Sequence, residues 1–155
     1  MSIEERLRQA GIELPQAAAP AANYVPFVME NGLLHIAGQI PFQKDGSLLK
    51  GRLGENQSIE EGQAAARLCA INLMAQMKAA LGSLDRVTRI VKLGVFVSST
   101  PDFTDQPKVA NGASDLMVEI FGDAGRHARS AVGVTVLPLG VPVEVDAIVA
   151  YASAF

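Results

Sequence analysis

Residues 58 to 82 carry the strongest signal in this sequence for a single element of defined length. Ser58 precedes Glu61 by three residues, a capping-box pattern that satisfies the first free N–H groups of a helix, and Gly82 is placed to end it. Apolar residues lie on most sides of the interval, in two stripes: Ile59, Ala66, Cys69, Leu73, Met77 and Ala80, and Ala64, Leu68, Ile71 and Ala75. The sequence predicts a helix to about Leu81 that packs on more than one side.

Apolar segments before and after this helix predict strands. The dipeptide Asn31-Gly32 between two apolar runs is the strongest short-range signal for a β-hairpin. The predicted elements are strands at 24–29, 33–37 and 89–97, a helix at 107–121 that ends at Gly122, and a last pair of strands at 130–137 and 143–151. The order ββαβαββ predicts an α+β fold, a mixed sheet with both helices on one face.

The 155 residues suit one domain preceded by a leader. Residues 1–20 predict a short helix capped by Ser2 and stopped by Gly11, followed by an Ala/Pro-rich stretch. Residues 21–155 predict a single domain, with a polar surface loop over 43–57.

Composition narrows the classes of partner. Hydrophobic residues make up 49% of the chain and charged residues only 19%, which is more apolar than a monomer of this size needs and favours self-association. The net charge of −3 and the lack of any Lys/Arg cluster argue against nucleic acid. No signal peptide and no membrane-length apolar run is present, so we expect a cytoplasmic protein. A single cysteine and two isolated histidines predict no metal site.

The last two predicted strands hold the candidate chemistry. Alternation predicts Arg129 and Ala131 on the face not covered by helices, with Val132, Val134 and Val136 on the core face. Glu144 and Asp146 fall on the uncovered face by the same rule. A guanidinium there can bind a carboxylate through two parallel hydrogen bonds, and a carboxylate can orient or activate water. Spacing alone leaves a structural ion pair of Arg129 as an alternative.

Pairing these strands as a hairpin separates the two candidates. A turn at 138–142 places Arg129 near Tyr151 and Glu144 near Val136, roughly 20 Å apart at the rise of a strand. A site that uses both side chains must then be completed by a second copy of the chain. Tyr24 could offer a hydroxyl or only packing, whereas we expect His127 to be solvated and His35 to lie in the core.

Several segments together resemble a known family. They are Arg129-Ser130-Ala131-Val132, Leu137-Pro138 and Val143-Glu144-Val145-Asp146-Ala147, extended by Gly38-Gln39-Ile40-Pro41, Val95-Phe96-Val97, Asp102-Phe103 and Val109 to Asn111. Over residues 24 to 150 the chain is similar to the RidA (YjgF) family of imine and enamine deaminases, also described as endoribonuclease L-PSP. The leader and the 43–57 loop resemble a longer subgroup of that family.

The resemblance implies a chorismate-mutase-like fold, a homotrimer with three sites between subunits, and no cofactor. By this resemblance Arg129 holds the carboxylate of a reactive 2-imino or 2-enamino acid, and Glu144 positions the water that converts it to a 2-oxo acid and ammonia. Tyr24, Gly38 and Ala131 correspond to substrate-binding positions. Ala131 replaces a frequent cysteine, and Pro101 replaces a polar residue near the site, so substrate shape can differ.

Two other functions compete with this one. A non-catalytic, regulatory trimer could use the same arginine to bind a carboxylate metabolite such as a 2-oxo acid. RNA cleavage fits poorly with the acidic pI near 5.3 and the lack of a basic or aromatic stacking surface.

Overall fold

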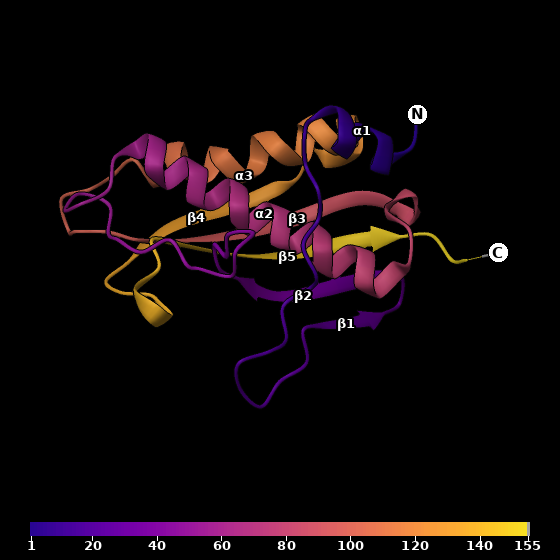
Figure 1. Ribbon diagram of the computed structural model, residues 1–155, viewed down its shortest axis with the longest axis horizontal. Helices are drawn as coiled ribbons and strands as arrows, with labels where there is room; N and C mark the ends of the chain where they lie inside the picture. The colour runs from indigo at the N-terminus through magenta and orange to yellow at the C-terminus, as the bar shows by residue number, and fades with distance from the viewer. Residues whose placement is uncertain (155) are drawn as a thin grey trace.

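The computed structural model describes residues 1–154, so Phe155, the last residue of the predicted domain, lies outside it. Two helices cover one face of a five-stranded sheet (Figure 1). The main elements are α1 Ile3–Gln9, β1 Phe27–Glu30, β2 Leu33–Gln39, α2 Ile59–Leu81, β3 Val87–Ser98, α3 Gln106–Phe121, β4 Ala128–Val134 and β5 Val143–Tyr151. Three short 3-10 turns are η1 Leu84–Arg86, η2 Gly122–Gly125 and η3 Pro138–Gly140. After α1, this order confirms the predicted ββαβαββ fold.

The local signals act as predicted. Ser58 Oγ accepts from the Glu61 N–H at 3.1 Å, and the Glu61 carboxylate accepts from the Ser58 N–H at 3.1 Å. Helix α2 ends at Gly82, whose φ of 79° lies in the left-handed region that glycine tolerates. Asn31 and Gly32 have φ values of 52° and 78°, the pair of positive values that a tight turn between β1 and β2 requires.

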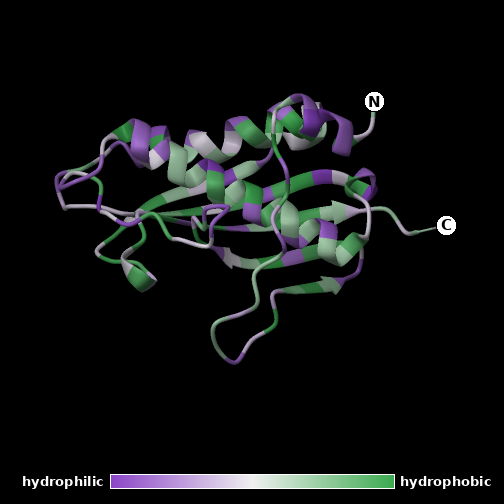
Figure 2. Cartoon of the chain, in the orientation of Figure 1, coloured by the Kyte–Doolittle hydropathy of each residue, from purple (hydrophilic) through white to green (hydrophobic). Residues whose placement is uncertain are grey.

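The core lies between the sheet and helices α2 and α3. Val143, Val145, Ala147 and Val149 of β5 form one buried row on the helix side of the sheet. Figure 2 shows hydrophobic residues along both helices and along the strands that the helices cover. Leu7 of α1 is 3% exposed and joins this core. No helix within residues 1–154 is long and apolar enough to cross a membrane.

The predicted hairpin between the last two strands is wrong. The sheet order is β1-β2-β5-β3-β4, so β5 lies between β2 and β3, whereas β4 pairs in parallel with the outer edge of β3. The physical reason is that β3, α3 and β4 form a crossover unit, which places its two strands side by side and parallel. Residues 135–142 then pass the end of β3, where Ser99 N–H donates to Val134 O and Ser98 N–H donates to Pro142 O.

This pairing also reverses the predicted faces of β4. Arg129 is in register with Leu93, which is in register with the buried Ala147, so Arg129 lies on the helix side. Val132 is in register with Phe96 on the uncovered face and is 45% exposed. An edge strand only partly covered by a helix can place polar residues toward that helix, which the alternation rule does not anticipate. The predicted face was right for Glu144 and Asp146.

Candidate functional site

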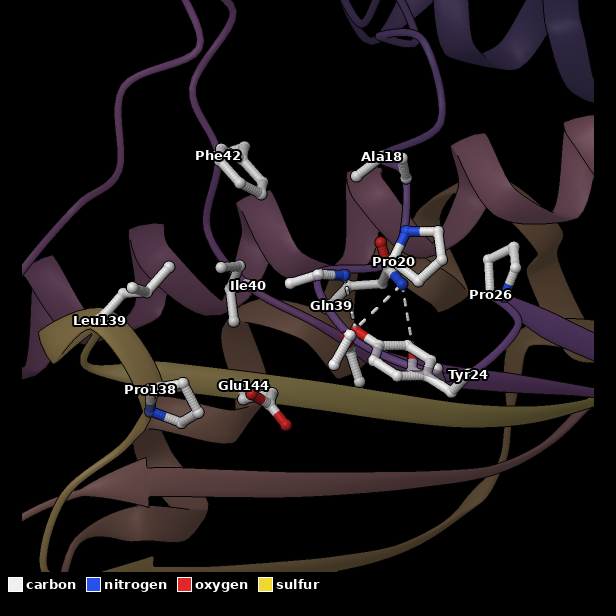
Figure 3. Close-up of a pocket in the computed structure, with 15 residues that line it drawn as sticks. Ala18, Pro20, Tyr24, Pro26, Gln39, Ile40, Phe42, Pro138, Leu139 and Glu144 are labelled. Carbon is white, nitrogen blue, oxygen red and sulfur yellow. Dashed lines mark hydrogen bonds between the residues drawn. The ribbon is translucent and has the colours of Figure 1, made fainter.

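A cavity of about 530 Å³ opens beside β2 and β5. Three of the five predicted site residues, Tyr24, Gly38 and Glu144, line it. Figure 3 labels Tyr24 and Glu144 among the lining residues. Most of the remaining wall is apolar: Ala18, Ala19, Pro20, Ala21, Ala22, Pro26, Ala37, Ile40, Phe42, Pro138 and Leu139. The cavity therefore joins the N-terminal leader, the end of β2 and the η3 turn around a single carboxylate.

Two glycines make room for the carboxylates of β5. A Cβ at Gly38 of β2 would collide with the Glu144 carboxylate, and one at Gly94 of β3 would collide with the Asp146 carboxylate. Each acid therefore lies flat over a neighbouring strand with no side chain beneath it. Gly38 provides space for Glu144, in addition to any backbone contact with a ligand.

Burial of Glu144 raises its pKa, and repulsion from Asp146 raises it further. Burial also raises the pKa of Asp146, although the backbone of Gly94 and the charge of Lys92 oppose that rise. A carboxylate whose pKa lies above its usual range binds a proton more readily at a given pH. Glu144 is thus suited to accept a proton from water.

Two buried amides of α2, which were not predicted from the sequence, lie behind the cavity and bond to residues that line it. Gln76 of α2 is 1% exposed and donates to Ala18 O at 2.9 Å and to Gln39 Oε1 at 3.4 Å. Asn72, one turn earlier, donates to Ile40 O at 3.0 Å. These amides fasten the leader and the end of β2 to the helix. Their signal was available, because two polar residues at helical spacing interrupt an apolar helix face.

Arg129 lies away from this cavity and contacts α3. Its Nη1 donates to Asn111 Oδ1 at 2.8 Å and to Ser114 Oγ at 3.1 Å, and its Nη2 donates to Pro107 O at 3.3 Å. Of the five guanidinium N–H groups, Nε–H and one on Nη2 have no partner among residues 1–154. Within the same residues Arg129 joins no salt bridge, so the structural ion pair is not observed. Ala131 packs against the core and does not line the cavity.

His127 is half-buried and contacts Ser114, the residue that also bonds Arg129, so the expectation of a solvated histidine is wrong. Its Nδ1 lies 2.6 Å from Gly125 O and its Nε2 lies 2.8 Å from Ser114 Oγ. Burial lowers the pKa of His127 against an opposing hydrogen bond to Gly125, and the charges of Arg129 and Arg89 lower it further. The neutral ring donates from Nδ1, accepts the Ser114 hydroxyl at Nε2, and leaves the Ser114 oxygen to accept from Arg129. By contrast, His35 is exposed and not in the core.

The chain does not bring the two predicted catalytic residues together. Arg129 faces the helices, whereas Glu144 registers with Phe96 on the uncovered face, two strands away. We also predicted that the two residues lie apart, but on a hairpin of β4 and β5 that the sheet order excludes. No group of three His, Cys, Asp or Glu side chains in residues 1–154 could hold a metal ion.

Residues 4–149 match the family described as "YjgF/chorismate_mutase-like, putative endoribonuclease". The chain belongs to the YjgF family. It is 55% identical to Protein TCP17 of Trypanosoma cruzi over 95% of this chain and 92% of that protein. A solved Shewanella oneidensis structure is 39% identical, with a TM-score of 0.93 over 97% of this chain and 99% of the other. Escherichia coli TdcF, solved with bound serine, is 27% identical, with a TM-score of 0.66 over 90% and 97% of the two chains.

Proposed function

We propose that this YjgF-family protein hydrolyses reactive 2-imino and 2-enamino acids to 2-oxo acids and ammonia. The observation that carries the proposal is the unpaired edge of the Arg129 guanidinium, held by α3 with Nε–H and one Nη2–H free of partners in residues 1–154. Two parallel N–H donors on a fixed guanidinium match the two oxygens of a carboxylate. A 2-imino acid carries that carboxylate beside its reactive carbon.

The positive charge of Arg129 and the negative charge of Glu144 suit the two ends of such a substrate. At neutral pH an iminium acid is positive at nitrogen and negative at the carboxylate. Arg129 would hold the negative end, and Glu144 would face the iminium group across the cavity. The bound serine of E. coli TdcF, a small molecule with an amino and a carboxylate group, supports a ligand of this kind.

Little further chemistry is needed from the protein, because the iminium carbon is already electrophilic. Glu144 accepts a proton from water as the water oxygen bonds to that carbon. Glu144 then returns that proton to the nitrogen, and as the C–N bond breaks the hydroxyl proton passes to Glu144, which releases ammonia and leaves the 2-oxo acid. An enamine must first take a proton at carbon to become the iminium form.

The proposed site requires two copies of the chain, and we propose a homotrimer with three such sites. Arg129 and Glu144 lie on opposite sides of the sheet, so one copy would supply the arginine and its neighbour the cavity. The uncovered sheet face also carries exposed apolar residues, including Val28 and Val132, that a second copy would bury.

The direct test is a coupled assay. An amino-acid oxidase supplies the imine, and its loss is followed by absorbance in competition with a trapping amine. Purified protein should speed the loss at micromolar concentration and release ammonia in equal amount. Binding of 2-oxo acids without any acceleration would instead indicate the non-catalytic metabolite-binding protein.

Sharing of the site between copies gives a second prediction. Arg129→Ala and Glu144→Gln chains, each inactive alone, should recover about a quarter of the wild-type activity when unfolded together and refolded at equal ratio. The reason is that random assembly pairs an intact arginine with an intact glutamate at about one site in four. Size-exclusion chromatography would check that the two variants form mixed oligomers. If mixed oligomers form and no activity is recovered, the site is not shared between copies.

The Ser114 contact gives a third prediction. Ser114→Ala removes the hydroxyl that bridges Arg129 and His127, so we expect binding of a 2-oxo acid to weaken roughly tenfold or more, the size of one hydrogen bond to a charged group. Ser114→Thr retains the hydroxyl and should bind nearly as the wild type does. Calorimetry measures both, and the matching 2-oxo amide is the control ligand. Equal weakening for acid and amide would show that Ser114 does not act through Arg129.

A further inference from the structure

One wall of the cavity comes from the leader, a segment that precedes the first strand. Residues 18–22 line it consecutively, opposite Pro138 and Leu139 of η3 (Figure 3). The leader has no regular secondary structure here, yet it follows a fixed path over the cavity. Its position therefore depends on specific contacts.

Those contacts begin with Gln76. Its amide is buried between α2 and the sheet, where an unpaired amide would be costly, and its Nε2 donates to Ala18 O at 2.9 Å. At the other end of the segment, Tyr24 N–H donates to Ala22 O at 2.9 Å and the Ala21 N–H donates to Tyr24 Oη at 3.4 Å. The wall is thus fastened to the core helix at Ala18, and a local turn with Tyr24 shapes its other end.

The cavity has few polar side chains, and each one either takes part in the proposed reaction or is already hydrogen-bonded to the protein. Glu144 is the proposed base, the Tyr24 hydroxyl accepts from the Ala21 N–H, and the Gln39 amide is bonded to Ala37 O and Gln76. Apart from Glu144, no lining residue carries a charge. A charged substrate side chain would lose its water without gaining a partner, whereas an apolar one would bury its surface. The volume of about 530 Å³ lies in the range that holds ligands far larger than a three-carbon acid.

We propose that residues 18–22, positioned by Gln76, form the specificity wall of the site and select imino acids with apolar side chains of several carbons. This inference rests on the proposed function for the reaction, but it concerns the side-chain end of the ligand. Each methylene buried against the wall should improve kcat/KM about fourfold. A leucine-derived imine should therefore exceed an alanine-derived imine by tenfold or more.

The test uses binding and turnover in parallel. Affinities of pyruvate, 4-methyl-2-oxopentanoate and 2-oxoglutarate are measured by calorimetry, together with turnover of the alanine and leucine imines. The wild type should bind 4-methyl-2-oxopentanoate at least tenfold more tightly than either of the other acids. Ala19→Leu fills the cavity from an exposed wall position and should reduce that preference at least fivefold. Gln16→Leu, exposed in the leader but outside the lining, is the matched control and should leave it unchanged.

Gln76→Leu tests the anchor with a side chain of similar size that suits an apolar core. It should lower the preference for 4-methyl-2-oxopentanoate as Ala19→Leu does, but because residues 18–22 are no longer held in place. Equal affinities for the three acids in the wild type, or a profile for Ala19→Leu equal to that of Gln16→Leu, would overturn the specificity wall. If the three acids bind in the expected order but no imine is turned over, the specificity wall stands and only the hydrolase activity is overturned. Binding of none of the acids would overturn both.

Discussion

Replacing Arg129 by alanine should reduce kcat/KM for imine hydrolysis by two to four orders of magnitude. Two charge-assisted hydrogen bonds to the substrate carboxylate are lost together, each worth about 1.5–3 kcal/mol. Lysine at this position retains the charge but not the two parallel donors, so Arg129→Lys should recover only a small part of the rate. The thermal midpoint should fall only modestly, because the bonds from the guanidinium to Asn111 and Pro107 are exposed and only the bond to Ser114 is partly buried.

The matched control is Arg126→Ala. Arg126 lies three residues away, and its one salt bridge within residues 1–154 is with the exposed Asp123, at 3.6 Å. The same imine assay should give a rate for this variant within twofold of the wild type. If the Arg129 and Arg126 variants hydrolyse the imine equally fast, the carboxylate clamp is wrong and the proposed reaction loses its main support.

Glu144→Gln should have the second largest effect and should act in opposite directions on activity and stability. Loss of a general base costs about 10²- to 10⁴-fold in rate. The same change removes a half-buried negative charge that lies near Asp146, so the variant should unfold at a higher temperature than the wild type at neutral pH.

The pH dependence of that gain follows from the raised pKa of Glu144. The folded chain binds the Glu144 proton more tightly than the unfolded chain, so folding is favoured while Glu144 is protonated. That contribution is complete below the ordinary glutamate pKa and is lost as pH rises through the raised value. The difference in melting temperature between Glu144→Gln and the wild type should therefore be small near pH 4 and grow toward pH 7.

Thermal melts across this pH range test the stability part. Glu55→Gln, in an exposed loop, removes the same charge elsewhere and should show neither the stabilisation nor the loss of rate. A Glu144→Gln protein that is less stable than the wild type at pH 7 would mean that the ionised carboxylate is favourably paired in the fold.

Features set by neighbouring residues were predictable. The capping box of Ser58 and Glu61, the Asn31-Gly32 turn and the order of elements depend on bonds within a few residues, so the linear pattern contains them. The uncovered position of Glu144 also followed from alternation, because β5 is a central strand with one buried row. Family resemblance added Tyr24 and Gly38, and the structure places both around the cavity with Glu144.

Features set by distant residues were not predictable. β5 could pair with β4 or insert between β2 and β3. The choice depends on which arrangement buries more apolar surface and pairs more backbone N–H and C=O groups, and neither quantity can be read from one segment of the sequence. The direction of Arg129 follows from that choice. Its contacts with Asn111 and Ser114, and the bond between Gln76 and Ala18, join residues 15 to 58 positions apart.

By itself, the sequence determined the α+β element order, the boundaries of the long helix and the residue types able to perform the proposed chemistry. The tertiary structure decided that Arg129 is held by α3 on the helix side, that Glu144 lies over Gly38, and that the leader closes the cavity. The physical reason is that caps and tight turns form within a few residues. By contrast, the face of an edge strand and the path of an irregular leader are fixed only by the packing and hydrogen bonds of the assembled fold.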